Sequence, residues 1–286
     1  MGSFRRSAGL VRSILMYYGV PWRNRALTGF YAQFVRPGDL CFDVGAHVGN
    51  RLRALSRLGA HVVAIEPQPQ CMRLLGRWYD HRPDIELVEE AVGVTGGTLT
   101  LFVSERTPTV STLSRDWIGA VGATPGFAGV RWDRGIPVRV TTLDELIARY
   151  GEPTFCKIDV EGAELDVLRG LSHPLEALSF EYIPAAIDVA VGYVGRLGEL
   201  GRYEYNFSPG ELPRLRASVW LSPAQITDVL RRMPMHERSG DVYARRLDHQ
   251  HQAIHRQVVN SAVSATPEPA LKKSQRISTV LLRESR

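Results

Sequence analysis

The sequence predicts an α/β protein with a Rossmann-like fold, in which a seven-stranded, mostly parallel sheet carries helices on both faces. Short apolar runs rich in valine, isoleucine and phenylalanine alternate along the chain with stretches of helical periodicity, which is typical of strand–helix–strand units. The first apolar run leads directly into a glycine-containing turn and a helix. A hydrophobic content of 44% over 286 residues is sufficient for one large core of this kind.

The individual elements follow from two periodicities, since side chains alternate every two residues in a strand and repeat every 3.6 residues in a helix. The apolar runs predict strands at 40–44, 61–65, 86–92, 155–160 and 178–183. The stretches between them predict helices at 50–57, 70–79, 143–150 and 164–171. Further strands are expected at 98–103, 137–141, 203–207 and 241–246, and further helices at 185–200 and 223–233.

Three segments are expected along the chain. Residues 1–36 predict an amphipathic helical extension, broken at Pro21, that either packs on the main domain or contacts a membrane surface or a partner. Residues 37–247 are expected to form the main domain. Residues 248–286 are rich in His, Gln, Ser and Lys and predict a basic, mostly disordered tail.

A long segment without clear periodicity, 104–135, interrupts the main domain. Loops of that length are usually functional or disordered, so we expect a substrate-side insertion. It carries Trp117, Phe127 and Trp132. These rings either pack as part of the core or a lid, or stack on the face of a sugar or polyketide.

Charge and cysteine content exclude several classes of protein. Much of the excess behind the formal net charge of +5 lies at the two ends of the chain, and no compact basic stripe with interleaved aromatic residues is visible, so nucleic acid is not an expected partner. Cys41, Cys71 and Cys156 are too scattered for a disulfide framework or a zinc site and predict buried thiols in a reducing cytoplasm. Neither a secretory signal nor an apolar run of about 18 residues is expected, which argues against a membrane span.

The strongest local signal is the stretch Leu40–Asn50, in which a buried strand runs into a glycine turn and then a helix. Such a turn suits a nucleotide-type cofactor, because glycine lets the backbone approach a ligand closely. Gly45 and Gly49 are spaced G-x-x-x-G, whereas a dinucleotide site needs G-x-G-x-x-G. Asp43 would repel a pyrophosphate at the helix N-terminus but would suit the ammonium group of a methionine-like tail.

An acidic residue after the second strand supports the same cofactor. Glu66 follows Gly45 by 21 residues, where its carboxylate can accept hydrogen bonds from both hydroxyls of a ribose. An unphosphorylated adenosine joined to a zwitterionic amino acid meets these conditions, so S-adenosyl-L-methionine is the expected cofactor, with its adenine near the end of the third strand. The residues predicted to bind it are Asp43, Gly45, Ala46, His47, Gly49, Asn50, Glu66, Pro67, Ala91 and Val92.

Several motifs together resemble the FkbM family of methyltransferases over about residues 30 to 246. The resemblance implies a class I methyltransferase fold and O-methylation of hydroxyl groups on macrolides, sugars and other natural products or polysaccharides. Val94 departs from the family pattern, which has an acidic residue at this position near the expected adenine contact. The resemblance rests on Phe42–Asn50, Ile65–Pro67, Ala91–Gly93, Thr142–Leu146, Phe180–Glu181 and, most specifically, Lys157–Glu164.

Three carboxylates are predicted to be catalytic. Methyl transfer to an alcohol needs an aligned acceptor, exclusion of water and removal of the hydroxyl proton. The carboxyl ends of neighbouring parallel strands converge, so Asp43, Asp159 and Glu181 are expected to meet there. We expect Asp159 to act as the base or to position the substrate, and Glu161 to bind substrate directly or through another group. Glu181 either pairs with Lys157 or contacts substrate.

Structural roles for the same residues stay open. Glu161 and Glu164 at a helix start could only complement its dipole, and a Lys157–Glu181 ion pair could be a tie inside the sheet. His47 could accept a proton, although packing or backbone bonding is the simpler role. The acidic cluster could bind Mg²⁺, but no dedicated ligand spacing supports this, so no metal site is predicted.

The sequence therefore predicts a cytoplasmic, S-adenosylmethionine-dependent methyltransferase that O-methylates a hydroxyl group of a small molecule, sugar or natural product. One alternative is an N-methyltransferase acting on a macromolecule, but Asp159-Val-Glu-Gly does not provide the Asn-Pro-Pro-Tyr type of turn. The other is a non-catalytic nucleotide-binding module, against which the retained Asp43, Glu66 and Asp159 argue. Assembly into a homo-oligomer is left open.

Overall fold

The computed structural model describes residues 2–18, 21–122, 124–210 and 212–247. These residues belong to one compact unit that ends at Leu247. The tail predicted to be disordered, 248–286, lies outside the described residues.

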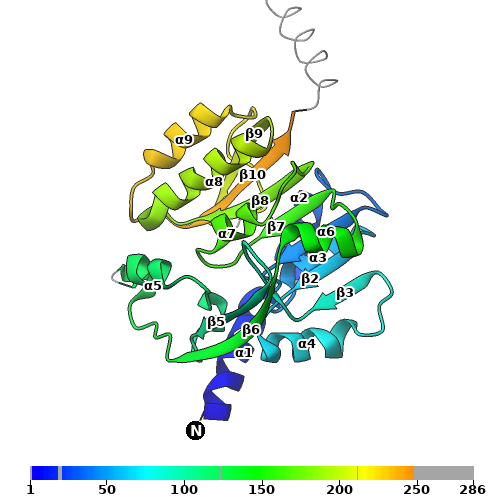
Figure 1. Cartoon of the computed structure of the whole chain (residues 1–286), viewed down its shortest axis with the longest axis vertical. Coiled ribbons are helices and arrows are strands. Elements are labelled where there is room, and N and C mark those ends of the chain that lie inside the picture. Colours follow the sequence, from blue (N-terminus) through cyan, green and yellow to red (C-terminus); the bar gives the residue numbers. More distant parts are fainter. Residues whose placement is uncertain (1, 19–20, 123, 211, 248–286) are drawn as a thin grey trace, which may run out of the picture. The chain divides into compact units, whose positions relative to one another are not determined.

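Within the described residues, seven strands form the main sheet: β1 (Leu40–Val44), β2 (His61–Ile65), β3 (Ile85–Val88), β7 (Phe155–Ile158), β8 (Ala177–Tyr182), β9 (Tyr203–Pro209) and β10 (Gly240–Arg246). Their order is β3-β2-β1-β7-β8-β10-β9 (Figure 1). Neighbours from β3 to β8 pair in parallel, whereas β10 runs antiparallel to both β8 and β9. The predicted seven-stranded, mostly parallel sheet is confirmed.

A smaller sheet in the same part of the chain contains β4 (Ala91–Val92), β6 (Arg134–Thr141) and β5 (Gly97–Val103), in that order. The single strand predicted at 86–92 is therefore wrong, because β3 ends at Val88 and β4 belongs to the other sheet. Glu90 lies between the two strands and its carboxylate pairs with Arg139, at 3.2 Å, and with Arg149, at 2.8 Å. These ion pairs hold the chain where it turns from one sheet to the other.

The helices begin and end close to the predicted residues. Two of them carry complete capping boxes, built by Thr142 with Glu145 and by Ser222 with Gln225. Among the described helices, none has both the length and the apolar character to cross a membrane. The helices are α1 (Gly2–Tyr18), α2 (Pro21–Tyr31), α3 (Asn50–Arg57), α4 (Pro69–Tyr79), α5 (Arg115–Val121), α6 (Leu143–Tyr150), α7 (Glu164–Arg169), α8 (Ile187–Leu200) and α9 (Pro223–Arg231), with short 3₁₀ turns η1 (Pro108–Val110), η2 (Pro125–Phe127) and η3 (Pro184–Ala186).

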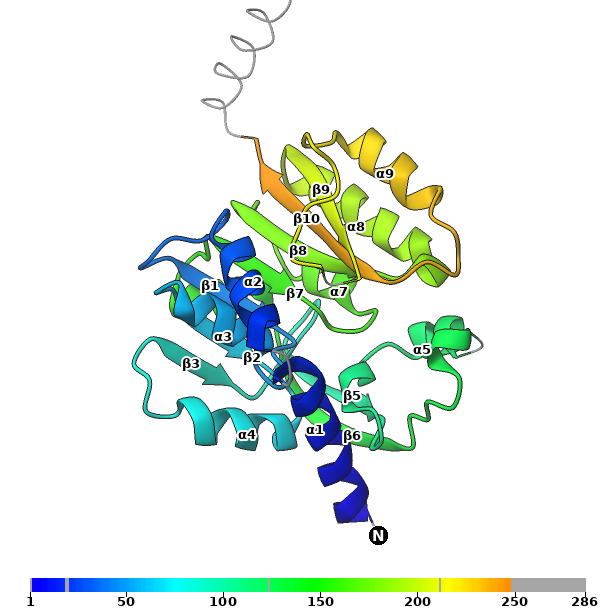
Figure 2. The same cartoon turned by 180° about the vertical axis from the view of Figure 1, so that it is seen from behind.

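The two faces of the main sheet bury separate cores, as the alternation of side chains along each strand requires. Phe42 and Val44 of β1 point into a core that includes side chains of α6, α7, α8 and α9. Cys41, the residue before Phe42, points into the opposite core, which includes side chains of α2, α3 and α4. Figure 2, which views the molecule from the side opposite to Figure 1, shows α2 and α3 in front of the sheet. This alternation decides which polar side chains reach which face.

The insertion 104–135 contains three short helical elements, η1, α5 and η2. Ser114 caps α5 by accepting a hydrogen bond from the Trp117 backbone N–H at 3.1 Å. The rings of Trp117, Phe127 and Trp132 lie against one another, with centroid separations of 5.3 to 6.4 Å. The rings therefore pack against one another, and their stacking on a substrate stays a prediction.

Candidate active site

The turn after β1 places its glycines where other residues would be strained. Gly45 and Gly49 have φ angles of 86° and 79°, in the left-handed region that glycine tolerates best. A Cβ atom on Gly45 would lie 1.9 Å from the backbone oxygen of Asp159. Gly45 therefore brings the carboxyl ends of β1 and β7 together, which positions the whole site.

Asp43 does not reach the mouth of the sheet with the other carboxylates. It faces the α2 and α3 side, where it is buried and accepts a hydrogen bond from the Leu52 backbone N–H at 2.9 Å. Burial raises its pKa to about 6, an effect that the nearby Arg51 and Lys157 oppose. Asp43 thus organises the first turn of α3, and the expected meeting of Asp43 with Asp159 and Glu181 is not formed.

Glu66 is one of the acidic residues that line the predicted cofactor pocket. One carboxylate oxygen accepts the His47 backbone N–H and the other accepts the Gln68 backbone N–H, both at 2.8 Å. Burial raises the pKa of Glu66 to about 7, while these two N–H donors oppose the rise. Each oxygen has a further lone pair that can accept a ligand hydroxyl.

A pocket opens beside Glu66, between β1, β2, β4 and the insertion. An apolar wall and acidic groups line it, and the described residues around it include neither Lys nor Arg. Phosphate groups would find no cation there, whereas an adenosine with a cationic amino-acid tail meets apolar surface and carboxylates. The residues therefore fit S-adenosylmethionine. The lining comprises Val44, Gly45, His47, Ile65, Glu66, Pro67, Gln68, Glu90, Ala91, Val92, Leu101, Thr109, Ser111, Leu113, Asp159, Val160 and Glu161.

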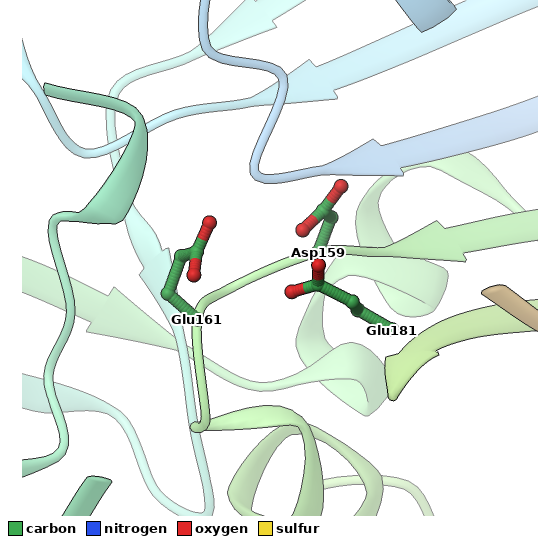
Figure 3. Close-up of side chains that lie close together, drawn as sticks. All are labelled: Asp159, Glu161 and Glu181. Atoms are coloured by element: carbon green, nitrogen blue, oxygen red, sulfur yellow. The ribbon is translucent and has the colours of Figure 1, made fainter. Parts of the chain in front are cut away.

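Asp159, Glu161 and Glu181 come together at the carboxyl ends of β7 and β8 (Figure 3). One oxygen from each carboxylate lies within 4.8 Å of the others, and all three residues are half-buried. Oxygens that close together can share a proton, a cation or several hydroxyl donors. The sequence analysis predicts no metal site, and that remains a prediction.

Two of the three carboxyl groups, those of Glu161 and Glu181, have raised pKa values. Burial raises the pKa of Glu161 well above its ordinary value, and the charges of Glu181 and Asp159 raise it further. Burial likewise raises the pKa of Glu181, with Asp159 and Glu164 adding to the effect. Two acids with raised pKa values therefore stand beside Asp159.

Lys157 forms a different ion pair from the one considered for Glu181. Its amine lies 2.9 Å from Asp241 Oδ1 and 3.3 Å from Asp159 Oδ2, and no pair with Glu181 forms in the described residues. Burial lowers the pKa of Lys157, but Asp159 and Asp241 more than offset this and the pKa rises. Asp241, which the sequence analysis did not single out, also lies 3.7 Å from an Arg51 nitrogen. A buried cation thus lies between Asp159 and Asp241.

His47 lies in the cofactor turn with a φ angle of 48°. Burial lowers its pKa to about 4, so the ring is neutral near pH 7. Its Nε2 atom is buried and has no hydrogen-bond partner among the described residues. The ring of Tyr17 meets it edge to face, with centroids 6.3 Å apart.

A second pocket adjoins the first. The two share Gly45, His47, Thr109, Asp159 and Glu161. Its other lining residues come from distant segments: Tyr17, Asn50, Arg51, Val110, Phe127, Glu181, Ile183 and Ser239. No local motif marks Tyr17, Thr109 or Ser239, because α1, the insertion and the β9–β10 side meet only in the folded chain.

The predicted cofactor residues fall into three groups. Gly45, His47, Glu66, Pro67, Ala91 and Val92 line the first pocket. Asn50 lines the second pocket at the start of α3. Ala46, Gly49 and Asp43 line neither pocket and belong to the turn and the strand end beside them. The Ala46 N–H donates a hydrogen bond to the Ile65 carbonyl at 3.0 Å.

The strand order with one reversed strand, and the glycine turn after β1, define the Rossmann-like fold of class I methyltransferases. Residues 43–194 match the Methyltransferase FkbM domain, which is more than half of the chain. The chain therefore belongs to the FkbM methyltransferase family.

One curated relative is the "Hexuronic acid methyltransferase AglP" of Haloferax volcanii, 24% identical over 168 residues. The match covers 56% of this chain and 63% of the relative, so the chain spans less than two thirds of that protein.

Among solved structures, the chain is similar to a SAM-dependent O-methyltransferase from Thermotoga maritima, with 13% identity and a TM-score of 0.40, covering 82% of this chain and 71% of that one. It is also similar to a precorrin-6y C5,15-methyltransferase from Geobacter metallireducens, with 13% identity and a TM-score of 0.40, covering 78% of this chain and 87% of that one. Similarities this remote carry no argument about function, so the fold assignment rests on the strand order itself.

Proposed function

We propose that this chain is an S-adenosylmethionine-dependent O-methyltransferase that acts on a hydroxyl group of a small molecule, with a sugar as the first class of acceptor to test. The observation that carries the proposal is the junction of the two pockets. Asp159 and Glu161 line both pockets. A cofactor in the first pocket and an acceptor in the second would therefore meet beside these two carboxyl groups.

The first pocket suits the cofactor. Glu66 would accept both ribose hydroxyls, and the acidic lining of the pocket would accommodate the cationic amino-acid end. S-adenosylmethionine supplies a methyl group that positive sulfur has already activated for attack. The chain itself then has to hold the acceptor in line and exclude water.

Asp159 is the proposed base. Its Oδ2 atom lies 3.3 Å from the Lys157 amine, an ion pair that holds the carboxylate in place to accept the hydroxyl proton as the alcohol attacks. Glu161 and Glu181, whose pKa values are raised, keep their protons more readily and can donate hydrogen bonds to other hydroxyls of the acceptor. Different environments thus give neighbouring carboxyl groups different roles.

The second pocket suits a hydroxylated acceptor. Tyr17 and Phe127 provide aromatic surface, and Asn50, Ser239 and the carboxyl groups provide hydrogen-bond partners. The relative from Haloferax volcanii is by name a methyltransferase of a sugar acid, which supports testing sugars first. As further parts of the proposal, the enzyme works in the cytoplasm, where its three buried thiols stay reduced, and it needs no nucleic acid.

The test is transfer of a labelled methyl group from S-adenosylmethionine to a panel of monosaccharides, methyl glycosides and extracted hydroxylated metabolites. Asp159→Asn should keep cofactor affinity, measured by calorimetry, within about twofold but lower turnover by about 100-fold, because it removes the general base. Asp166→Asn is the matched control, since Asp166 is exposed on α7 and lines neither pocket.

Unchanged turnover in Asp159→Asn would remove Asp159 from the mechanism. Cofactor binding without transfer to any hydroxylated acceptor would favour the non-catalytic module.

A further inference from the structure

Glu161 has an unusual backbone conformation. Its φ angle is 55°, in the left-handed region that few residues other than glycine adopt, and Gly162 follows with a φ angle of 87°. Such conformations persist only when the surrounding structure holds them in place. The contacts around the Glu161–Gly162 peptide are therefore informative.

This peptide is bonded at both of its polar ends. The Glu161 carbonyl accepts a hydrogen bond from the Thr112 hydroxyl at 2.6 Å, and the Gly162 N–H donates to Glu164 Oε2 at 3.0 Å. Glu164 is itself fixed, because it also accepts the Val160 N–H at 3.0 Å. Rotation of the peptide plane would break both bonds to it.

The direction of the Thr112 bond is defined by a second contact. The Thr112 oxygen accepts the Ser114 backbone N–H at 2.9 Å, so its hydrogen is available for the Glu161 carbonyl. Thr112 itself is buried. The hydroxyl therefore links the insertion to the loop after β7.

The ring of Trp117, in α5, packs against Gly162 of the same peptide. A Cβ atom on Gly162 would lie 2.1 Å from Trp117 Cδ1, so only glycine allows the ring to pack there. Two residues of the insertion thus hold the peptide from one side while α7 holds it from the other.

We propose that Thr112 is a positioning residue for Glu161: its hydroxyl fixes the Glu161–Gly162 peptide so that the Glu161 carboxyl group faces Asp159 and Glu181. Without that bond the Glu161–Gly162 peptide loses one of the two hydrogen bonds that hold its plane, the left-handed conformation of Glu161 is no longer fixed, and its side chain moves away from the junction of the two pockets. The catalytic part of this inference rests on the proposed function, whereas the structural part does not.

The experiment compares Thr112→Val, which keeps the shape of the side chain but removes the hydroxyl, with Thr112→Ser, which keeps the hydroxyl. In the full chain, the hydrogen exchange rate of the Gly162 amide should rise by about tenfold in Thr112→Val and stay near the wild-type value in Thr112→Ser, because one hydrogen bond is lost in the first variant only. Methyl transfer to the acceptor panel should fall in Thr112→Val and stay near the wild-type rate in Thr112→Ser. Cofactor affinity should be unchanged in both variants.

Thr124→Val is the matched control. Its hydroxyl also bonds a carbonyl of the insertion, that of Val121 at 2.7 Å, but lines neither pocket and does not contact Glu161. It should leave the Gly162 amide and turnover unchanged.

Equal exchange rates of the Gly162 amide in Thr112→Val and the wild type would overturn the proposal. An exchange rate that rises as much in Thr112→Ser as in Thr112→Val would also overturn it. The exchange measurement needs no acceptor, so a wild-type protein that methylates nothing refutes the proposed function while the role of Thr112 is still tested.

Discussion

Glu66 links the protonation of a single residue to cofactor binding. The Glu66 carboxylate must accept hydrogen bonds from a ribose, and its pKa is raised to about 7 by burial. Below that pH one oxygen carries a proton and accepts less well. We therefore predict that the affinity for S-adenosylmethionine rises between pH 6 and pH 8, as measured by calorimetry.

Glu66→Gln should weaken binding by about tenfold or more at pH 8 and abolish the pH dependence, since hydrogen bonds to a charged acceptor are the stronger ones. Glu89→Gln is the control, because Glu89 is exposed and lines neither pocket. A wild-type affinity that does not change between pH 6 and pH 8 would contradict this role of Glu66.

Individual site residues could be predicted where strand geometry determines their place. Asp159 and Glu181 follow or end neighbouring parallel strands, and the structure brings them together as expected. Asp43 as a cofactor ligand stays a prediction, but alternation with Phe42 and Val44 directs it to the face that α3 covers, and it lines neither pocket. The alternation was visible in the sequence, whereas the identity of the covering helix was not.

Asp241, the partner of Lys157, could not be predicted from local sequence. It is 84 residues away, and the two meet only because β10 is inserted antiparallel beside β8. Strand order is a property of the folded chain and not of the motif around Lys157.

At the scale of elements, β1, β2, α3 and α6 coincide with their predicted ranges. Their signals are strong because a buried strand or an amphipathic helix has one clear periodicity. The failure at 86–92 has a local cause, since Glu90 forms ion pairs at the point where the chain leaves one sheet for another. Periodicity cannot distinguish one long strand from two short ones in different sheets.

The packing of β1 against β7 depends on Gly45. Gly45→Ala should destabilise the protein by about 3 kcal/mol or more, because its Cβ would lie 1.9 Å from the Asp159 carbonyl at a positive φ angle. Denaturant unfolding followed by circular dichroism measures the change.

Gly76→Ala in α4 is the matched control, since no atom lies within 4 Å of the added Cβ. It should be neutral or stabilise the fold by roughly 0.5–1 kcal/mol. Equal stabilities of the two variants would show that β1 and β7 do not approach each other as described.

For the whole molecule, the buried acids determine how stability depends on pH. Glu66 has a folded pKa of about 7 against an ordinary value of 4.5, and the pKa values of Glu161 and Glu181 are also raised. Between pH 6.5 and pH 8 the folded chain therefore holds more protons than the unfolded chain. The stability that these acids contribute is complete below about pH 4.5 and is lost as the pH rises through the folded values.

We therefore predict that the free energy of unfolding falls from pH 6.5 to pH 8 in the absence of cofactor. His47 has the opposite effect, which is largest between about pH 4 and pH 6.5 and small above about pH 7, because its folded pKa is about 4 and its ordinary value is 6.5. Urea unfolding at pH 6.5, 7.2 and 8 checks this, and Glu66→Gln should flatten the curve. A protein that becomes more stable over this range would contradict the burial of these acids.

The whole molecule also explains why the second pocket escaped prediction. Tyr17 comes from α1, Phe127 from η2 and Ser239 from the residue before β10, and these segments meet over the carboxyl ends of the strands. Contacts that join segments so far apart leave no periodic signal. The sequence predicted that an insertion would carry aromatic rings, but not that Thr112 and Trp117 would hold the loop of Glu161.

The pocket beside Glu66 should accept a cationic, unphosphorylated adenosine derivative. Calorimetry of the purified full chain with S-adenosylmethionine and, separately, with NAD tests this. We expect one binding site for S-adenosylmethionine and no heat of binding for NAD. Binding of NAD with no binding of S-adenosylmethionine would contradict this expectation.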